Sequence, residues 1–183
     1  MNYATIKSRD IANGPGVRVS LFVSGCTHHC KGCFNSVAWD FDYGQPFTDQ
    51  TIREILELLR PDYIKGITLL GGEPFEPANQ PDLVRLLRSI RATYPEKSVW
   101  AFSGYLFDKD ILPGHLGDPE ITKEFISMVD VLVDGRFVEE KRDLTLRFRG
   151  SSNQRIIDVP ASLQHGKVIL WQDWQGNGRG IKG

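Results

Sequence analysis

The chain has few cysteines, no long apolar run and no excess of either charge. Its three cysteines lie within one eight-residue window, and an odd number so closely spaced makes a poor disulfide framework. The 22 basic and 23 acidic residues leave a formal net charge of −1, which disfavours coating of a nucleic-acid backbone. No apolar run approaches the length of a membrane span, and the N-terminus lacks a signal core. We therefore expect a cytoplasmic protein without nucleic-acid or membrane partners.

Hydrophobic periodicity alternates between strand-like and helix-like segments along most of the chain. It predicts strands over residues 18–23, 66–70, 98–102 and 129–133, and helices over 49–60, 81–94 and 119–128. Repeated strand–helix units favour a mostly parallel sheet, because right-handed crossovers return the chain to the same edge each time. Four strands are too few for a closed eight-stranded barrel. We therefore predict an α/β fold built as an open or partial (β/α) barrel.

Each predicted strand ends at a junction that contains glycine. These junctions are Gly25-Cys26, Gly71-Gly72-Glu73-Pro74, Ser103-Gly104-Tyr105 and Asp134-Gly135. In parallel α/β folds the carboxyl ends of the strands share one rim, where ligands bind. The four junctions are therefore expected to converge on one mouth.

The periodicity breaks down after about Leu144. Residues 146–155 are polar and basic, two short apolar runs follow at 156–159 and 168–171, and residues 175–183 have the composition of a flexible tail. We predict one domain over residues 1–160 and an extension over 161–183, either flexible or used for docking. Trp100, Trp171 and Trp174 are interpreted as packing residues.

The cysteines form a loop with the spacing C-x3-C-x2-C at Cys26, Cys30 and Cys33. Soft thiolates at such spacing favour zinc, copper(I) or an iron–sulfur cluster. A structural zinc site needs a fourth ligand, for which His28 and His29 are the nearest candidates, but we expect both to face solvent. A 4Fe–4S cubane held by three cysteines would keep one iron open to substrate.

This loop, together with Gly71-Gly72-Glu73-Pro74, resembles the radical S-adenosylmethionine enzymes. The resemblance implies a 4Fe–4S cluster on the three cysteines, with S-adenosylmethionine chelated to the open iron and its amino group bound by the backbone of the GGE segment. Many members have an aromatic residue before the third cysteine, where this chain has Gly32. The expected cofactor contacts, which include two residues at the strand ends, are Gly32, Cys33, Phe34, Gly71, Gly72, Glu73, Ser103 and Asp134.

Further stretches resemble one branch of that family, the activating proteins of anaerobic ribonucleoside-triphosphate reductases. They are residues 13–18, 21–26, 71–74, 131–135 and 149–154. The branch implies one-electron cleavage of S-adenosylmethionine to methionine and a 5′-deoxyadenosyl radical, which takes hydrogen from a glycine Cα of the reductase large subunit. An electron donor such as reduced flavodoxin is implied as well. Arg149, Ser151, Asn153 and Arg155 are the candidate partner contacts at the mouth.

Several alternatives stay open from the sequence. A related activase could serve pyruvate formate-lyase, and the small carboxy-deazaguanine synthases keep the same cysteine loop but act on a small molecule. A non-enzymatic alternative is a zinc-stabilised binding module. The GGE segment and Asn13-Gly14-Pro15-Gly16 could each be simple turns, Ser103 and Asp134 could only cap the mouth, and the arginines near 147–155 could form a solvated basic face.

Overall fold

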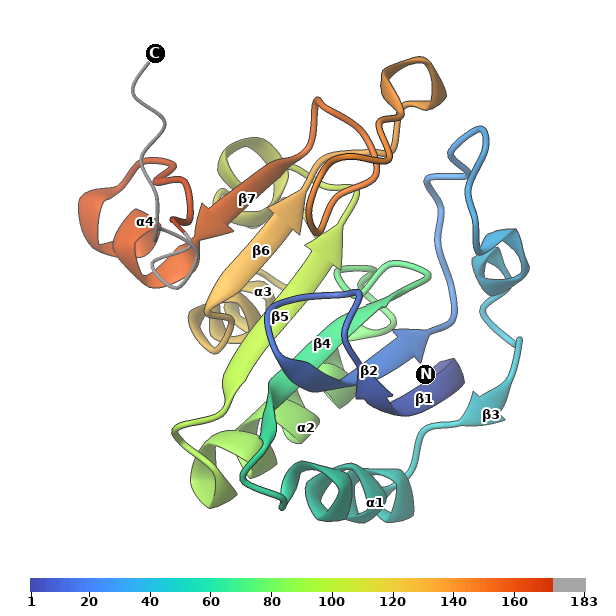
Figure 1. Cartoon of the computed structure of the whole chain (residues 1–183), viewed down its shortest axis with the longest axis vertical. Coiled ribbons are helices and arrows are strands. Elements are labelled where there is room, and N and C mark those ends of the chain that lie inside the picture. The colour runs from blue at the N-terminus through green and yellow to red at the C-terminus, as the bar shows by residue number, and fades with distance from the viewer. Residues whose placement is uncertain (173–183) are drawn as a thin grey trace.

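The computed structural model describes residues 1–172 and contains a seven-stranded mixed sheet of order β3-β1-β2-β4-β5-β6-β7 (Figure 1). The strands are β1 (Asn2–Asp10), β2 (Val17–Val23), β3 (Gln45–Pro46), β4 (Ile64–Gly71), β5 (Ser98–Ser103), β6 (Val131–Asp134) and β7 (Arg155–Asp158). The helices are α1 (Asp49–Leu59), α2 (Gln80–Thr93), α3 (Pro119–Ser127) and α4 (Val159–His165). Short helical turns occupy Ser36–Trp39, Phe107–Ile111 and Glu139–Lys141.

The four predicted strands are present and pair in parallel as β2-β4-β5-β6. The structure adds antiparallel strands on both sides, because β1 pairs with β2 and β3, and β7 pairs with β6. The sheet does not close on itself: β3 and β7 are its edges. The α/β class and the parallel centre are therefore confirmed.

Local sequence signals place the three predicted helices. Thr48 caps α1 through a reciprocal capping box with Thr51, which satisfies backbone N–H groups that the first turn leaves free. Pro81 lies in the first turn of α2, and Pro119 begins α3 after its cap, Asp118. Proline suits these positions because its missing N–H has no helical partner there.

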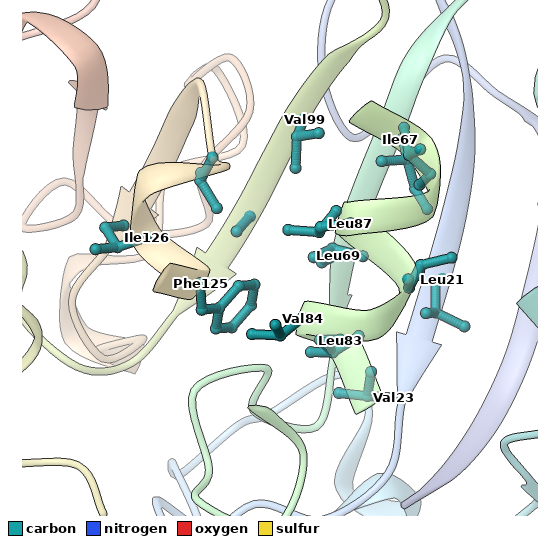
Figure 2. Packing of buried hydrophobic residues seen from close by; sticks show 14 of the residues in the cluster. Leu21, Val23, Ile67, Leu69, Leu83, Val84, Leu87, Val99, Phe125 and Ile126 are labelled. Atoms are coloured by element: carbon teal, nitrogen blue, oxygen red, sulfur yellow. The ribbon is translucent and has the colours of Figure 1, made fainter. Parts of the chain in front are cut away.

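The main core lies between α1–α3 and one face of the sheet. Figure 2 shows Leu83, Val84 and Leu87 of α2 over Ile67 and Leu69 of β4, with Phe125 and Ile126 of α3 beside them. The opposite face carries a smaller cluster, in which Trp100 packs against Phe148 and Trp171. Both faces of the central strands are thus covered, as is usual for parallel sheets.

The edge strands carry weak sequence signals. Strand β1 is half-buried or exposed except at Asp10, so burial imposes no clear alternation on it.

Residues 161–172 pack on the domain, with Asp158 N–H donating to Ile169 O at 2.9 Å and Trp171 N–H to Ile156 O at 2.9 Å. The expected tail and Trp174 lie outside the described residues, so the division at residue 160 stays a prediction.

No helix within residues 1–172 combines the length and the apolar character that crossing a bilayer requires.

Candidate functional site

The ends of the four parallel strands meet at one edge of the sheet. Val23 is level with Gly71, and Ser103 with Asp134. The loops that follow rise beyond the arrowheads, in blue and in orange in Figure 1. The predicted convergence of the four junctions is therefore confirmed.

The cysteine loop and the GGE segment are joined through their backbones. Gly72 N–H donates to Val23 O at 2.7 Å, and Glu73 N–H donates to Gly25 O at 2.8 Å. A side chain at position 72 would have no room, because its Cβ would lie 2.5 Å from Gly25 O and 2.9 Å from Ala38 O. The second glycine is thus required by close backbone approach rather than by an unusual φ angle.

A cavity of about 590 Å³ opens at this edge, a size typical of small-molecule sites. The three cysteines line it, together with seven of the eight predicted cofactor contacts: Gly32, Cys33, Phe34, Gly71, Gly72, Glu73 and Ser103. Its other walls come from the loop after β1, from the ends of β4 and β5, and from residues 135–154. One cavity thus contains both motifs that the sequence singled out.

Each cysteine sulfur has a backbone N–H group beside it. Asn35 N–H donates to Cys33 Sγ at 3.4 Å. The backbone N–H groups of His28 and His29 act to lower the pKa of the Cys26 thiol, and that of Phe137 acts to lower the pKa of Cys30, although burial outweighs them. Such hydrogen bonds stabilise thiolates and tune iron–sulfur clusters.

The cysteines differ in burial, since Cys26 is buried whereas Cys30 and Cys33 are half-buried. In the metal-free protein burial, reinforced by nearby Glu73 and Glu76, raises the pKa of the Cys26 thiol to about 11. Metal binding must therefore displace the Cys26 proton.

Two carboxylates of the segment after β4 anchor the cysteine loop. Glu76 accepts hydrogen bonds from the Thr27 N–H at 2.8 Å and the Thr27 hydroxyl at 2.6 Å. Glu73 lies 3.0 Å from His28 Nε2. The expectation that His28 faces solvent is wrong, because its side chain is turned inward to Glu73, whereas His29 is exposed and its ring stacks on Trp39.

Asp134 and Arg155 serve the fold around the mouth. The Arg155 guanidinium binds both carboxylate oxygens of Asp134, at 2.9 and 2.6 Å, and also Asp108 at 2.6 Å. Asp134 additionally accepts from Phe107 N–H at 2.8 Å. Neither Asp134 nor Arg155 lines the cavity, so the structure does not bring them to the cysteines.

The other predicted partner contacts form hydrogen bonds within residues 135–154, the segment that lines one side of the cavity mouth. The buried Ser151 hydroxyl accepts from Val138 N–H at 3.2 Å, and the Asn153 amide donates to Arg136 O at 2.9 Å. Arg149 donates to Gln154 O at 2.6 Å, yet it still lines the cavity. Of the four, only Arg149 reaches the mouth.

Some residues that support the site are not among the predicted site residues. The buried Asn79 amide donates to Ser24 O and Glu73 O, both at 3.0 Å, and so ties β2 to the GGE segment. The buried Arg18 donates to Thr68 at 2.8 Å, and Thr68 donates to Asn13 O at 2.8 Å, which places Asn13 in the cavity wall. The available sequence signal for these residues was a polar side chain, Arg18 or Thr68, inside each of two predicted strands.

Within residues 1–172, no group of three or more histidine, cysteine, aspartate or glutamate side chains is placed to share one metal ion.

Comparison with known proteins agrees with this geometry. Residues 12–157 match the family described as a 4Fe-4S single cluster domain. This match places the chain in a class of iron–sulfur proteins. Curated relatives then specify the branch. The chain is 43% identical over 156 residues to the anaerobic ribonucleoside-triphosphate reductase-activating protein of Escherichia coli K12, covering 84% of this chain and 96% of the relative. The protein of the same name from Enterobacteria phage T4 is 40% identical, with 85% and 93% covered, and that from Vibrio cholerae is 38% identical, with 85% and 97% covered. This chain belongs to the family of anaerobic ribonucleoside-triphosphate reductase-activating proteins.

Proposed function

We propose that this chain activates an anaerobic ribonucleoside-triphosphate reductase by reductive cleavage of S-adenosylmethionine, leaving a glycyl radical on the reductase. The observation that carries the proposal is that the chain's three cysteines and the GGE backbone line one cavity. The relatives' name supports the choice of partner. We assign the open sheet to a partial (β/α) barrel of the radical S-adenosylmethionine type.

The donor set fits a 4Fe–4S cluster. Cys26, Cys30 and Cys33 would hold three irons, and their backbone N–H donors would stabilise the charged sulfurs. When bound and reduced, the cluster would supply the electron for cleavage of S-adenosylmethionine, and the resulting 5′-deoxyadenosyl radical would take hydrogen from a glycine Cα of the reductase. The electron donor is proposed to be a small redox protein such as reduced flavodoxin.

The cavity suits the charge of S-adenosylmethionine. Glu73 is 1% exposed, lines the cavity and is bonded to backbone N–H groups, a hydroxyl and an imidazole. Its buried negative charge favours a cationic ligand, such as a sulfonium, in the same cavity. Gly71 and Gly72 present bare backbone beside it, while Gly32, Cys33 and Phe34 line the wall formed by the cysteine loop.

The rim suits a macromolecular substrate. Phe34 and Leu144 line the cavity, yet each is 84% exposed, the highest exposed fraction among the large apolar side chains of the described residues. We assign them, with Arg149, to contacts with the entering loop of the reductase. Ser151, Asn153 and Arg155 are assigned to supporting the rim.

The test is to purify the protein anaerobically, reconstitute it with iron and sulfide, reduce it, and measure 5′-deoxyadenosine and methionine formation. The single variants Cys26→Ala, Cys30→Ala and Cys33→Ala are the controls. We expect cleavage in the parent protein and none in the variants, and a glycyl radical signal once the reductase is added. Zinc without iron or labile sulfide, and no cleavage after reconstitution, would refute the assignment. Cleavage without radical transfer to the reductase would point instead to another glycyl-radical enzyme or to a small-molecule substrate.

A further inference from the structure

His28 differs from its neighbours in the cysteine loop. Thr27 and His29 are exposed, whereas the His28 side chain is only 4% exposed. Its ring packs edge-on against Tyr105, with the ring centres 4.3 Å apart. Any Cβ at Gly104 would overlap the His28 ring, so the end of β5 accommodates this imidazole.

The Glu73 carboxylate links His28 to two strand ends. One oxygen accepts from Phe75 N–H and from the Ser103 hydroxyl, each at 2.9 Å. The other accepts from Gly104 N–H at 2.7 Å and contacts His28 Nε2 at 3.0 Å. Of these four partners only His28 belongs to the cysteine loop, so it links the loop to Glu73 and the end of β5, beside the separate link from Thr27 to Glu76.

The two ring nitrogens of His28 have different surroundings. A carboxylate only accepts hydrogen bonds, so Nε2 carries the proton that faces Glu73. Nδ1 is buried and has no hydrogen-bond partner among the described residues. An unsatisfied buried polar atom costs about 1–3 kcal/mol, and such a cost is tolerated where a side chain has a role in a site.

From these contacts we infer that His28 is a positioning residue for the cofactor site, an inference that rests on the proposed function. Through Nε2 it holds Glu73, and therefore the Gly71–Gly72 backbone, in register with the cysteine loop. The two parts of the site lie on different segments, with the thiolates on the loop and the GGE backbone after β4. Backbone hydrogen bonds and the Thr27–Glu76 pair join these segments, and His28 adds the contact that orients the Glu73 carboxylate. Its loss therefore weakens S-adenosylmethionine binding without loss of the cluster.

The experiment compares anaerobically reconstituted parent protein with His28→Ala, His28→Asn and His28→Gln. Glutamine places an amide N–H near the position of Nε2, whereas asparagine is too short to reach Glu73. His29→Ala is the matched control, because the adjacent imidazole is exposed and stacks on Trp39. For each protein we measure iron and sulfide content, the S-adenosylmethionine Kd by equilibrium dialysis, the change that S-adenosylmethionine causes in the spectrum of the reduced cluster, and the thermal unfolding of the metal-free chain.

We expect full iron and sulfide content in all variants. The Kd should rise about tenfold in His28→Ala and His28→Asn, with a diminished spectral change, and should return close to the parent value in His28→Gln. His29→Ala should match the parent.

Parent-like affinity and spectra in His28→Ala would overturn the inference. A His28→Gln protein that folds but binds as weakly as His28→Ala would also overturn it, since packing against Tyr105 would then be the cause. Both results leave cofactor binding by the parent intact, whereas failure of the proposed function would appear as a parent that binds neither iron nor S-adenosylmethionine.

Discussion

Replacement of Gly72 by alanine should move the GGE segment away from the cysteine loop. The added methyl group would lie 2.5 Å from Gly25 O and 2.9 Å from Ala38 O, both backbone atoms, so the segments must move apart. That movement stretches two backbone hydrogen bonds, from Gly72 N–H to Val23 O at 2.7 Å and from Glu73 N–H to Gly25 O at 2.8 Å.

The size of the effect follows from these contacts. Two weakened hydrogen bonds cost about 2 kcal/mol together, which lowers the Tm of a chain of this length by about 4–8 °C. A displacement of reacting groups that approaches 1 Å costs about 100-fold in rate. We therefore expect Gly72→Ala to bind iron, to unfold at a lower temperature and to cleave S-adenosylmethionine about 100-fold more slowly.

Gly166→Ala is the matched control. Gly166 ends α4 with φ +64° and has no atom within 4 Å of an added Cβ, so only backbone strain of about 1–2 kcal/mol is introduced. Its Tm should fall while its cleavage rate stays at the parent value. A Gly72→Ala protein with parent-like Tm and a rate within about threefold of the parent would refute the close-packing argument.

Three further predictions concern the rim and its support. Leu144→Asp should slow glycyl radical formation on the reductase about tenfold and leave cleavage without the reductase unchanged; an equal loss in both assays would contradict a role in docking. Asp134→Asn should lower the free energy of unfolding in urea by about 2 kcal/mol, because it removes the charge of buried Asp134 from its hydrogen bonds with half-buried Arg155; a loss below about 1 kcal/mol would refute the importance of that pair. The hydrogen bond from Arg155 lowers the pKa of Asp108 below its usual value, so this pair stabilises the fold above the usual pKa of an aspartate and its contribution is lost as pH falls through the folded pKa. Asp108→Asn should therefore unfold with less dependence on pH between about pH 5 and about pH 3, and an unchanged dependence would contradict the assignment.

The sequence by itself determined the central fold and the reactive loop. Alternating apolar residues in β2, proline and threonine at the helix starts, and glycine at the strand ends report local backbone needs, which a sequence states directly. The spacing of Cys26, Cys30 and Cys33 has the same local character. From these signals alone the parallel strands, α1–α3, the rim and the cysteine loop at that rim could be predicted.

Only the tertiary structure decided which polar groups face the cavity. His28 resembles an exposed loop residue in the sequence, yet it is buried because Gly104, from another strand end, leaves room for its ring. Asp134 lies on the correct rim, but Arg155, which is distant in sequence, occupies its carboxylate. Such choices depend on contacts between segments far apart in the chain, and local patterns carry no record of which partner binds a buried charge.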